Sequence, residues 1–386
     1  MLDRLVGLPQ TTGKQQELPE GRAVVAQTNR FQTSRMFARA RVVRGLAAAF
    51  LLSTGVCLPS GTLMASDDEA VNIYSARKEA LILPLLERFR DETGIEFNLV
   101  TGKADELLKR LQLEGSATPA DVLITTDAGR LHRAREAGVL QAIESDPILR
   151  SVPDQLRDAD GFWIGLSQRA RTIIHARHRV DAAELSTYED LADPRWKGRV
   201  CVRSSSNIYN QSLVASMIEA VGAERTEAWA GGLVENFARP PAGGDTDQLR
   251  AVAAGQCDVA IANTYYFGRL VASGKEEDRD VVAELELFWP NQGPDDRGVH
   301  VNVSGAGITA HARHRDNAVR LLEFLLAPES QAWYAEVNHE YPVVGDVPVS
   351  ETLRSFGDFK ADTLNLTRLG ANNRKAVELM DRARWR

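Results

Sequence analysis

The chain has 386 residues and a formal net charge of -7, from 46 basic and 53 acidic residues. This length allows one to three domains, and the composition is that of an ordinary globular protein. The acidic balance argues against nucleic acid as the main partner, because nucleic-acid-binding proteins usually present a basic face.

Residues 1–65 are predicted to be an N-terminal extension that ends in a secretory signal peptide. Three arginines in "ARARVVR" precede the short apolar run "GLAAAFLLSTGVCL", and "TLMA" resembles the residues before a signal-peptidase cut. The run is too short and too interrupted for a membrane-spanning helix. We expect the signal to start at about Met36 and to be cleaved after Ala65. The alternative is a lipoprotein signal acylated at Cys57, which is disfavoured because Val56 stands where Ala or Gly is usual.

Beyond residue 70, strand-like and helix-like patterns alternate along the chain. Apolar runs predict strands, and apolar residues at helical spacing predict helices. The predicted strands are 70–76, 95–101 and 120–126, and the predicted helices are 79–94, 104–115 and 128–138. This order predicts an α/β layer with parallel strands and right-handed crossovers.

The α/β pattern continues in the second half, and no Gly/Pro/Ser linker separates the halves. The predicted elements there are two strand-like runs in 161–177, a helical turn and a strand in 186–205, helices at about 210–221 and 224–236, a helix and an apolar strand in 246–266, a β-rich segment at 298–311, a helix pair at 315–337 and a final helix from about 371. We therefore predict two α/β lobes joined by crossing strands, with a ligand cleft between them.

The lobes are predicted to be discontinuous in sequence. The N-terminal lobe comprises residues 70–165 plus about 292–342. The C-terminal lobe comprises about 166–291 plus 343–386. Two cysteines follow the signal, Cys201 and Cys257. In an oxidising compartment they suggest one disulfide, and the alternative is two buried free thiols.

Two segments share a Cys-to-Tyr spacing. In "CVRSSSNIYN" and "CDVAIANTYY" an apolar strand is predicted to open with Cys, and a tyrosine follows eight residues later, at Tyr209 and Tyr265. The spacing puts each tyrosine just beyond a strand end, where α/β proteins bind ligands. Tyr266 adds a third phenol, and we expect the chain to turn at Tyr265 so that the neighbours converge. The alternative is that these tyrosines anchor loops by packing.

Three phenols suit one type of ligand in particular. A phenol has an ordinary pKa of about 10, so only a strong Lewis acid deprotonates several at neutral pH. Phenolate is a hard oxygen donor and matches a hard cation such as Fe³⁺, whereas zinc and copper favour His and Cys. If Tyr209, Tyr265 and Tyr266 bind such an ion, its affinity should fall in acid.

Two basic clusters could support a site. "YSARKEA" contains Arg77, Lys78 and Glu79 at a predicted helix start, where two cations and the helix amides could hold a small anion and Glu79 could bind a metal directly. The alternative is a solvated first turn. Arg169 and Arg171, between the two strand-like runs, either face the cleft behind the ligands or lie on a solvated sheet edge.

Signals of enzymatic chemistry are poor. The serine run at 204–206 lacks a nucleophile-elbow pattern, and the seven histidines form no HExxH-type pair. We therefore expect no covalent catalysis. If the tyrosines bind iron, the protein could still be a periplasmic enzyme that uses tyrosinate-bound iron, and this is one alternative hypothesis. The other is a binding protein for a polyamine, a sugar or an organic anion.

Across nearly all of residues 70–386, the chain resembles the periplasmic ferric-ion-binding proteins of ABC importers. The likeness is carried by "IYSARKEAL", "GKADELLKRL", "PADVLITTDAGRL", "WKGRVCVRSSSNIYNQSLVASMIEA", "FARPPAGGDTDQLRAVAAGQCDVAIANTYYFGRL" and "NHEYPV". It implies a type II periplasmic-binding-protein fold that closes on Fe³⁺. It also implies that Tyr209, Tyr265 and Tyr266 are iron ligands, and that a permease in the inner membrane receives the ion from a monomeric receptor.

The chain departs from this family at one place. Many members have a His-Tyr pair after the first strand, where this chain has Lys78 and Glu79. Other members lack a ligand there and bind iron through three tyrosines and a carbonate-like anion. This chain looks closest to that group, so we expect an anion held partly by Arg77 or Lys78, with direct binding of Glu79 as the alternative.

Overall fold

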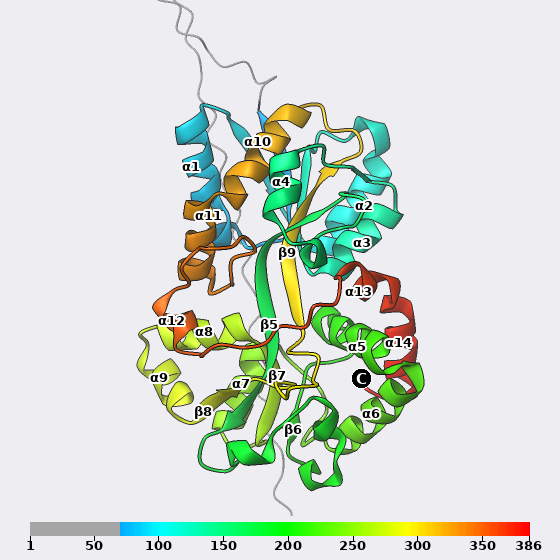
Figure 1. Ribbon diagram of the computed structural model, residues 1–386, viewed down its shortest axis with the longest axis vertical. Coiled ribbons are helices and arrows are strands. Elements are labelled where there is room, and N and C mark those ends of the chain that lie inside the picture. Colours follow the sequence, from blue (N-terminus) through cyan, green and yellow to red (C-terminus); the bar gives the residue numbers. More distant parts are fainter. Residues whose placement is uncertain (1–69) are drawn as a thin grey trace, which may run out of the picture. The chain divides into compact units, whose positions relative to one another are not determined.

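A computed structural model describes residues 70–386, so the predicted signal peptide and the alternative acylation site at Cys57 lie outside the described residues. The strands form one sheet in the order β2-β1-β3-β9-β5-β7-β6, with β4 paired to β9 and β8 to β5 (Figure 1). The strands are β1 (Val71–Ser75), β2 (Phe97–Thr101), β3 (Val122–Thr126), β4 (Leu140–Gln141), β5 (Ile164–Ala176), β6 (Val200–Cys201), β7 (Val259–Asn263), β8 (Leu285–Phe288) and β9 (Val301–Thr309).

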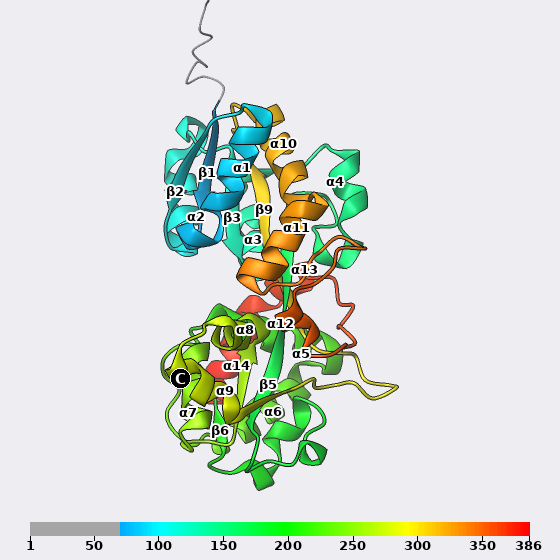
Figure 2. The same cartoon turned by 90° about the vertical axis from the view of Figure 1, so that its left-hand side faces the viewer.

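Helices cover the sheet in both lobes (Figures 1 and 2). The α-helices are α1 (Leu83–Thr93), α2 (Ala104–Glu114), α3 (Ala128–Glu136), α4 (Asp146–Ser151), α5 (Ile208–Val221), α6 (Ala223–Glu235), α7 (Asp245–Ala253), α8 (Thr264–Ala272), α9 (Glu276–Ala283), α10 (Arg315–Leu326), α11 (Pro328–Trp333), α12 (Glu351–Arg354), α13 (Thr367–Ala371) and α14 (Asn373–Arg382). A π-helical turn, η8 (Tyr334–Asn338), continues α11. No helix within residues 70–386 is long and apolar enough to cross a membrane.

The first three strands are parallel, as the alternation of strands and helices predicts. β1 lies between β2 and β3 and runs parallel to both. In the second lobe β6 and β7 are also parallel. Each of these strands leads into a helix, so the helix starts and the carboxyl ends of the strands gather at one edge of the sheet in each lobe.

Two antiparallel strands, β5 and β9, connect the lobes (Figure 1). β5 pairs with β9 over Ile164–Ala170 and with β7 over Arg171–His175. The sequence predicted two strand-like runs in 161–177, and this prediction was wrong because β5 is a single strand of 13 residues. The arginines in its middle interrupt the apolar pattern but not the strand, because they find polar partners inside the protein.

Each lobe has its own apolar core. One cluster contains buried residues from Val71 to Leu166 and from Val303 to Val343, and two others contain residues from Ala170 to Val301 and from Ala376 to Trp385. The predicted lobe boundaries do not follow these clusters everywhere, and they stay a prediction. Residues 299 and 301 pack in the second lobe, and residues 366 and 369 of the tail pack in the first.

The predicted helix over 79–94 starts later than expected. Glu79–Leu81 form a 3₁₀ turn, Ile82 leaves helical geometry with φ -146°, and α1 begins at Leu83. Pro84 explains this start, since proline has no amide hydrogen and fits only the first turn of an α-helix. Gly94 ends α1 at φ 72°, in the left-handed region that glycine adopts readily. The chain after β1 therefore presents a short turn, not the N-terminus of a long helix.

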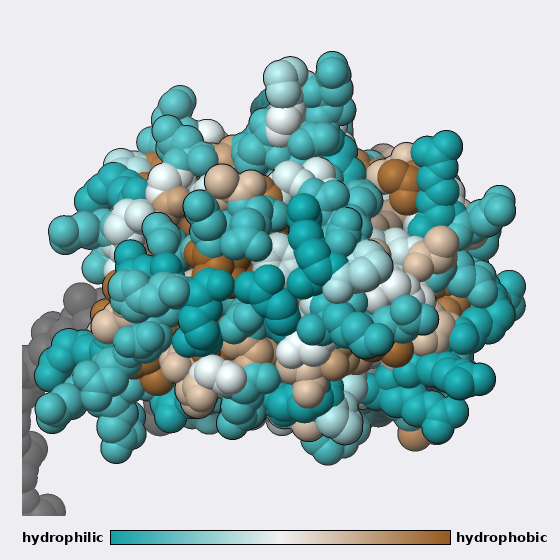
Figure 3. Space-filling view, turned by 90° about the horizontal axis from the view of Figure 1, so that it is seen from below, coloured by the Kyte–Doolittle hydropathy of each residue, from teal (hydrophilic) through white to brown (hydrophobic). Residues whose placement is uncertain are grey.

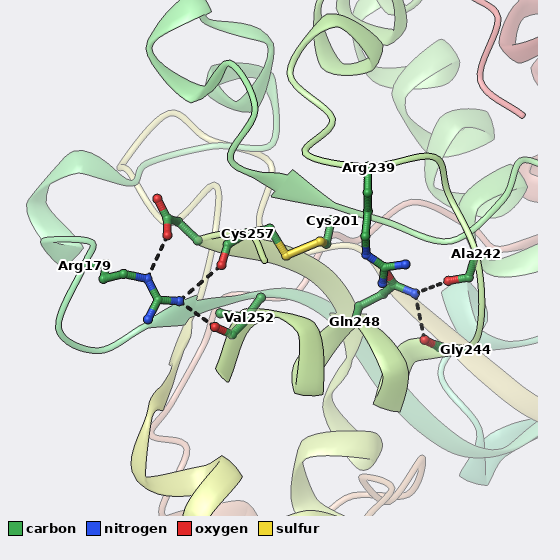
Figure 4. The surroundings of a disulfide bond; sticks show 9 residues. Arg179, Cys201, Arg239, Ala242, Gly244, Gln248, Val252 and Cys257 are labelled. Carbon is green, nitrogen blue, oxygen red and sulfur yellow. Dashed lines mark hydrogen bonds and ion pairs between the residues drawn. A yellow bond between two sulfur atoms is a disulfide. The ribbon is translucent and has the colours of Figure 1, made fainter. Parts of the chain in front are cut away.

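A disulfide joins Cys201 to Cys257, beside the paired strands β6 and β7 and 56 residues apart in sequence (Figure 4). Cys201 is the last residue of β6, whereas Cys257 precedes β7 by two residues. The prediction that both strands open with Cys was therefore wrong. The short strand β6 ends at its Cys, and β7 starts two residues after Cys257. The bond restricts the unfolded chain and ties together the two strands that lead toward the tyrosines.

The lower end of the second lobe is mainly hydrophilic, with small and separate apolar areas (Figure 3). Scattered apolar residues of this kind are normal on a protein surface. This visible face therefore has no broad apolar area that would indicate a permanent partner.

Candidate functional site

A cavity of about 170 Å³ lies where the two lobes face each other. The first lobe contributes residues that follow β1 and end β3, and the second lobe contributes residues from the first turns of α5 and α8. The polar residues that line it are Arg77, Lys78, Thr126, Tyr209, Tyr265, Tyr266, Arg269 and Glu340. The three tyrosines singled out by their spacing are therefore brought together.

Tyr209 projects from the first turn of α5. Asn207 caps this helix, and its side-chain oxygen accepts the backbone N–H of Tyr209 at 3.1 Å. Asn is a preferred residue at this position because its side chain satisfies an otherwise unpaired amide. The cap fixes where α5 begins and thereby directs Tyr209 toward the cavity.

Tyr265 and Tyr266 lie in the first turn of α8, directly after β7. The expectation that the chain turns irregularly at Tyr265 was wrong, because a regular helix already starts at Thr264. The two rings lie close together, with centroids 4.3 Å apart and a tilt of 32°. The Tyr265 hydroxyl donates to the Tyr209 hydroxyl at 3.3 Å. A helix start thus lets two adjacent tyrosines line the same cavity.

Burial raises the pKa of both Tyr265 and Tyr266. Tyr209 acts in the same direction on each, and Arg169 opposes the shift at Tyr265 while Arg203 opposes it at Tyr266. These two phenols are therefore neutral at neutral pH in the empty site. A cation that binds them as phenolates must displace their protons.

Guanidinium groups surround the three rings. The Arg169 and Arg203 guanidinium carbons lie 5.4 and 5.6 Å from the centre of the Tyr209 ring. Arg269 lies 4.8 Å from the Tyr265 ring centre and 5.8 Å from that of Tyr266. Cations at this distance are attracted to an aromatic ring and favour the phenolate over the phenol. The surroundings therefore suit an anionic donor set.

The two predicted arginines of β5 are both buried. Arg169 is 2% exposed and Arg171 is 1% exposed, so neither lies on a solvated sheet edge. Arg169 Nη1 donates to Ser304 Oγ at 3.2 Å, while its Nη2 has no hydrogen-bond partner within residues 70–386. Arg169 lies against the Tyr209 ring, whereas Arg171 bonds to Asn210 and Asn263 and neither arginine lines the cavity, so a role behind the ligands stays a prediction.

The three predicted residues of the first lobe occupy different positions. Lys78 is exposed and lines the cavity, whereas Glu79 is exposed and is not among the lining residues. Arg77 is buried and forms an ion pair with Glu340, with Nη1 and Oε2 3.0 Å apart. The structure thus brings Arg77 and Lys78 to the tyrosines but leaves Glu79 outside.

Glu340 is a cavity residue that the sequence analysis did not single out. Its carboxylate accepts hydrogen bonds from Arg77, Ser167 and Ser304. Burial alone would raise the pKa of Glu340, but Arg77 and Arg169 outweigh it and hold that pKa below its usual value. The only signal in the sequence was that Glu340 belongs to "NHEYPV", one of the segments that carry the family resemblance.

Asp127 links the lobes beside the cavity. It follows Thr126 with a φ of 88°, which is uncommon for a residue other than glycine. Its carboxylate accepts the Ser212 hydroxyl of α5 at 2.8 Å and the Asn302 amide of β9 at 2.9 Å. This contact holds the end of β3 against the helix that carries Tyr209.

The donor chemistry of the cavity is unusual for a metal site. No group of three or more His, Cys, Asp or Glu residues that could hold a metal ion occurs in the part of the chain described here. Tyrosine oxygens are outside those residue types, and three of them converge in the cavity. Such a set fits a small, hard, highly charged cation.

The comparisons with known proteins agree with this architecture. Residues 85–362 match the family model described as bacterial extracellular solute-binding protein. Iron uptake protein A1 of Synechocystis sp. is 48% identical over 320 residues, which cover 83% of this chain and 88% of that protein. The Fe(3+)-binding periplasmic protein of Serratia marcescens is 29% identical over 343 residues, which are 88% of this chain and 98% of that protein.

A solved structure gives the same result in three dimensions. A Trichodesmium protein (IdiA, FutA) in complex with iron and citrate ligands is 48% identical and superposes with a TM-score of 0.79, covering 82% of this chain and all of that protein. The likeness confirms the predicted two-lobe periplasmic-binding-protein fold. The chain therefore belongs to the family of bacterial extracellular solute-binding proteins.

Proposed function

We propose that this protein is a periplasmic ferric-ion receptor of an ABC-type iron importer. In this proposal Tyr209, Tyr265 and Tyr266 bind Fe³⁺ as phenolates, and the loaded receptor delivers the ion to a permease in the inner membrane. The receptor acts as a monomer and performs no covalent chemistry. The observation that carries the proposal is the convergence of three phenols in one small cavity between the lobes.

Charge and size both support this assignment. Three phenolates neutralise Fe³⁺, so little net charge is buried when the ion binds. The cavity of about 170 Å³ is smaller than typical pockets for organic ligands, which measure roughly 300–1,000 Å³. A sugar or a polyamine therefore fits this cavity less well than an ion with a small anion. The names of the relatives, which refer to iron uptake and ferric-ion binding, point in the same direction.

The function is tested by adding ferric nitrilotriacetate to the mature, metal-free protein. We expect one tightly held iron per chain and a visible absorption band from phenolate-to-iron charge transfer. A protein that retains no iron after removal of excess chelate, or retains it without this band, would contradict the proposal. A turnover assay on the iron-loaded protein tests the rival enzyme hypothesis.

We further propose that a carbonate-like anion completes the iron site. Lys78 and Arg77 both line the cavity, and Arg77 Nε has no hydrogen-bond partner within the described residues. Glu79 does not reach the cavity, which favours the anion over direct binding of that carboxylate.

We expect removal of bicarbonate to weaken ferric binding by about tenfold, the value of one charge-assisted hydrogen bond. Glu79→Ala should bind iron as the wild type does, like the control Glu87→Ala on the exposed face of α1. Competition with a chelator measures the affinities. The anion idea fails if bicarbonate has no effect and Glu79→Ala loses iron.

A further inference from the structure

Arg171 bonds to residues at the starts of α5 and α8, the two helices that carry the three tyrosines. It belongs to β5, its side chain is 2% exposed, and it pairs in the sheet with Asn263 of β7. Its Nη1 donates to Asp245 Oδ2 at 3.3 Å and to Asn263 Oδ1 at 3.1 Å. Its Nη2 donates to Asn210 Oδ1 at 2.6 Å and to the Ile261 carbonyl at 3.2 Å. One buried guanidinium thus connects four groups from three elements of the second lobe, α5, α7 and β7.

Three of these four partners stand at helix N-termini. Asn210 follows Tyr209 in the first turn of α5, and Asn263 occupies the N-cap position of α8, two residues before Tyr265, without a capping bond from its side chain. Asp245 is the first residue of α7, and its Oδ2 also accepts the backbone N–H of Asn263 at 3.0 Å. The starts of α5, α7 and α8 are therefore joined through Arg171.

We propose that Arg171 is a positioning residue that sets the separation of the three phenol oxygens. This inference rests on the ferric-binding function proposed above. Tyr209 and Tyr265 come from different helices, yet their hydroxyl oxygens lie 3.3 Å apart. That separation depends on how α5 and α8 are placed against each other, and Arg171 bonds to Asn210 within α5 and to Asn263 at the N-cap position of α8. Ligand sets need to be held within about 0.5 Å of the productive geometry.

The contacts favour positioning over simple charge neutralisation. Asp245 has a second cation nearby, because Arg203 Nη1 lies 3.6 Å from its Oδ1. Arg171 uses only part of its donor capacity on Asp245 and directs the rest to the amides of Asn210 and Asn263. A planar guanidinium can reach acceptors on several sides at once, whereas the ammonium of lysine is a point charge. Arg171→Lys therefore keeps the charge but loses the connections.

The test compares Arg171→Lys with Arg179→Lys. Arg179 is a control for the hydrogen bonding alone: it also bonds to a carboxylate (Asp258) and to two carbonyls (Val252 and Cys257) in the same lobe, but its side chain is 35% exposed (Figure 4). Arg179 follows β5 and contacts the residues that precede β7, whereas the tyrosines Tyr265 and Tyr266 follow the other end of β7. We measure thermal unfolding, ferric affinity by competition from ferric nitrilotriacetate, and the visible charge-transfer band.

We expect Arg171→Lys to bind Fe³⁺ about 10–100-fold more weakly than the wild type, the usual effect of losing a residue that supports metal ligands. Its charge-transfer band should also shift or weaken. Arg179→Lys should retain wild-type affinity and band, even where it unfolds at a lower temperature. Equal losses of affinity in the two variants, or a wild-type affinity and band in Arg171→Lys, would overturn the proposal.

A second variant covers the case in which Arg171→Lys fails to fold. The Asn263 side chain bonds to Arg171 through Oδ1, and its Nδ2 has no partner among residues 70–386. Asn263→Ala removes this one connection to α8 and leaves the bond from its backbone N–H to Asp245. We expect a smaller loss of affinity with an altered band, and an unchanged band would overturn the inference.

These outcomes are distinct from failure of the proposed function. If the wild type binds no iron, the function itself is wrong. If the wild type binds iron and Tyr265→Phe does not, while both Arg171→Lys and Asn263→Ala bind it normally, the function stands and the positioning role of Arg171 is rejected.

Discussion

Replacing Tyr265 with Phe is expected to lower the ferric affinity by about a thousandfold and to leave the fold intact. The change removes one oxygen and no carbon, so packing in the first turn of α8 is preserved. It leaves Fe³⁺ with one phenolate too few, and breaking a buried ion pair in this way costs about 3–5 kcal/mol. Tyr266→Phe should behave similarly. Affinity is measured by chelator competition, together with the visible band.

Tyr341→Phe is the matched control for this experiment. Its hydroxyl is buried and has no hydrogen-bond partner in the described part of the chain, and Tyr341 does not line the cavity. It should bind iron like the wild type. If Tyr265→Phe also retains wild-type affinity, Tyr265 is only a packing residue and the three-phenolate site is wrong.

Acid is expected to release the iron steeply. Burial raises the pKa of Tyr265 and Tyr266, so both phenols carry protons at neutral pH in the empty site. Each phenol that binds Fe³⁺ as phenolate releases its proton, and lower pH therefore favours the empty form. If three protons leave per ion, the affinity falls by up to about a thousandfold per pH unit.

A pH-stat titration measures this proton release directly. Iron is transferred from a chelate whose own proton uptake is known, and the remaining protons are counted per iron bound. In bicarbonate-free buffer we expect about three from the wild type, one for each phenol, because bicarbonate that binds as carbonate would release a proton of its own. Tyr265→Phe should release one fewer at protein and iron concentrations that saturate it. A count below one in the wild type would show that the phenols do not bind as phenolates.

Much of the fold could be predicted from the sequence because its elements have clear periodicity. The apolar runs of β1, β2 and β3 and the helical spacing of α2 and α3 lie close to their predicted positions. The crossing strands could also be expected, since no linker separates the halves. Local errors arose where tertiary contacts override the pattern. The mixed polar stretch of β5 stays extended because Arg171 pairs with Asp245 and Arg169 bonds to Ser304 inside the protein.

The candidate site was only partly predictable. The matched spacing of Tyr209 and Tyr265 after two cysteines indicated that distant tyrosines could meet, and the structure places them in one cavity. Nothing local in the sequence indicated Glu340 or Asp245. Glu340 pairs with Arg77, and Asp245 pairs with Arg171. The partners are far apart in the sequence and meet only in the folded protein.

The central claim is that three phenolates hold one ferric ion between the lobes. X-ray diffraction at the iron absorption edge, from crystals of the iron-loaded protein, tests it most directly. The account predicts one anomalous peak about 2 Å from each hydroxyl oxygen of Tyr209, Tyr265 and Tyr266, the usual distance between a metal and an oxygen ligand. A peak elsewhere, or a peak bound to only one of these oxygens, would contradict it.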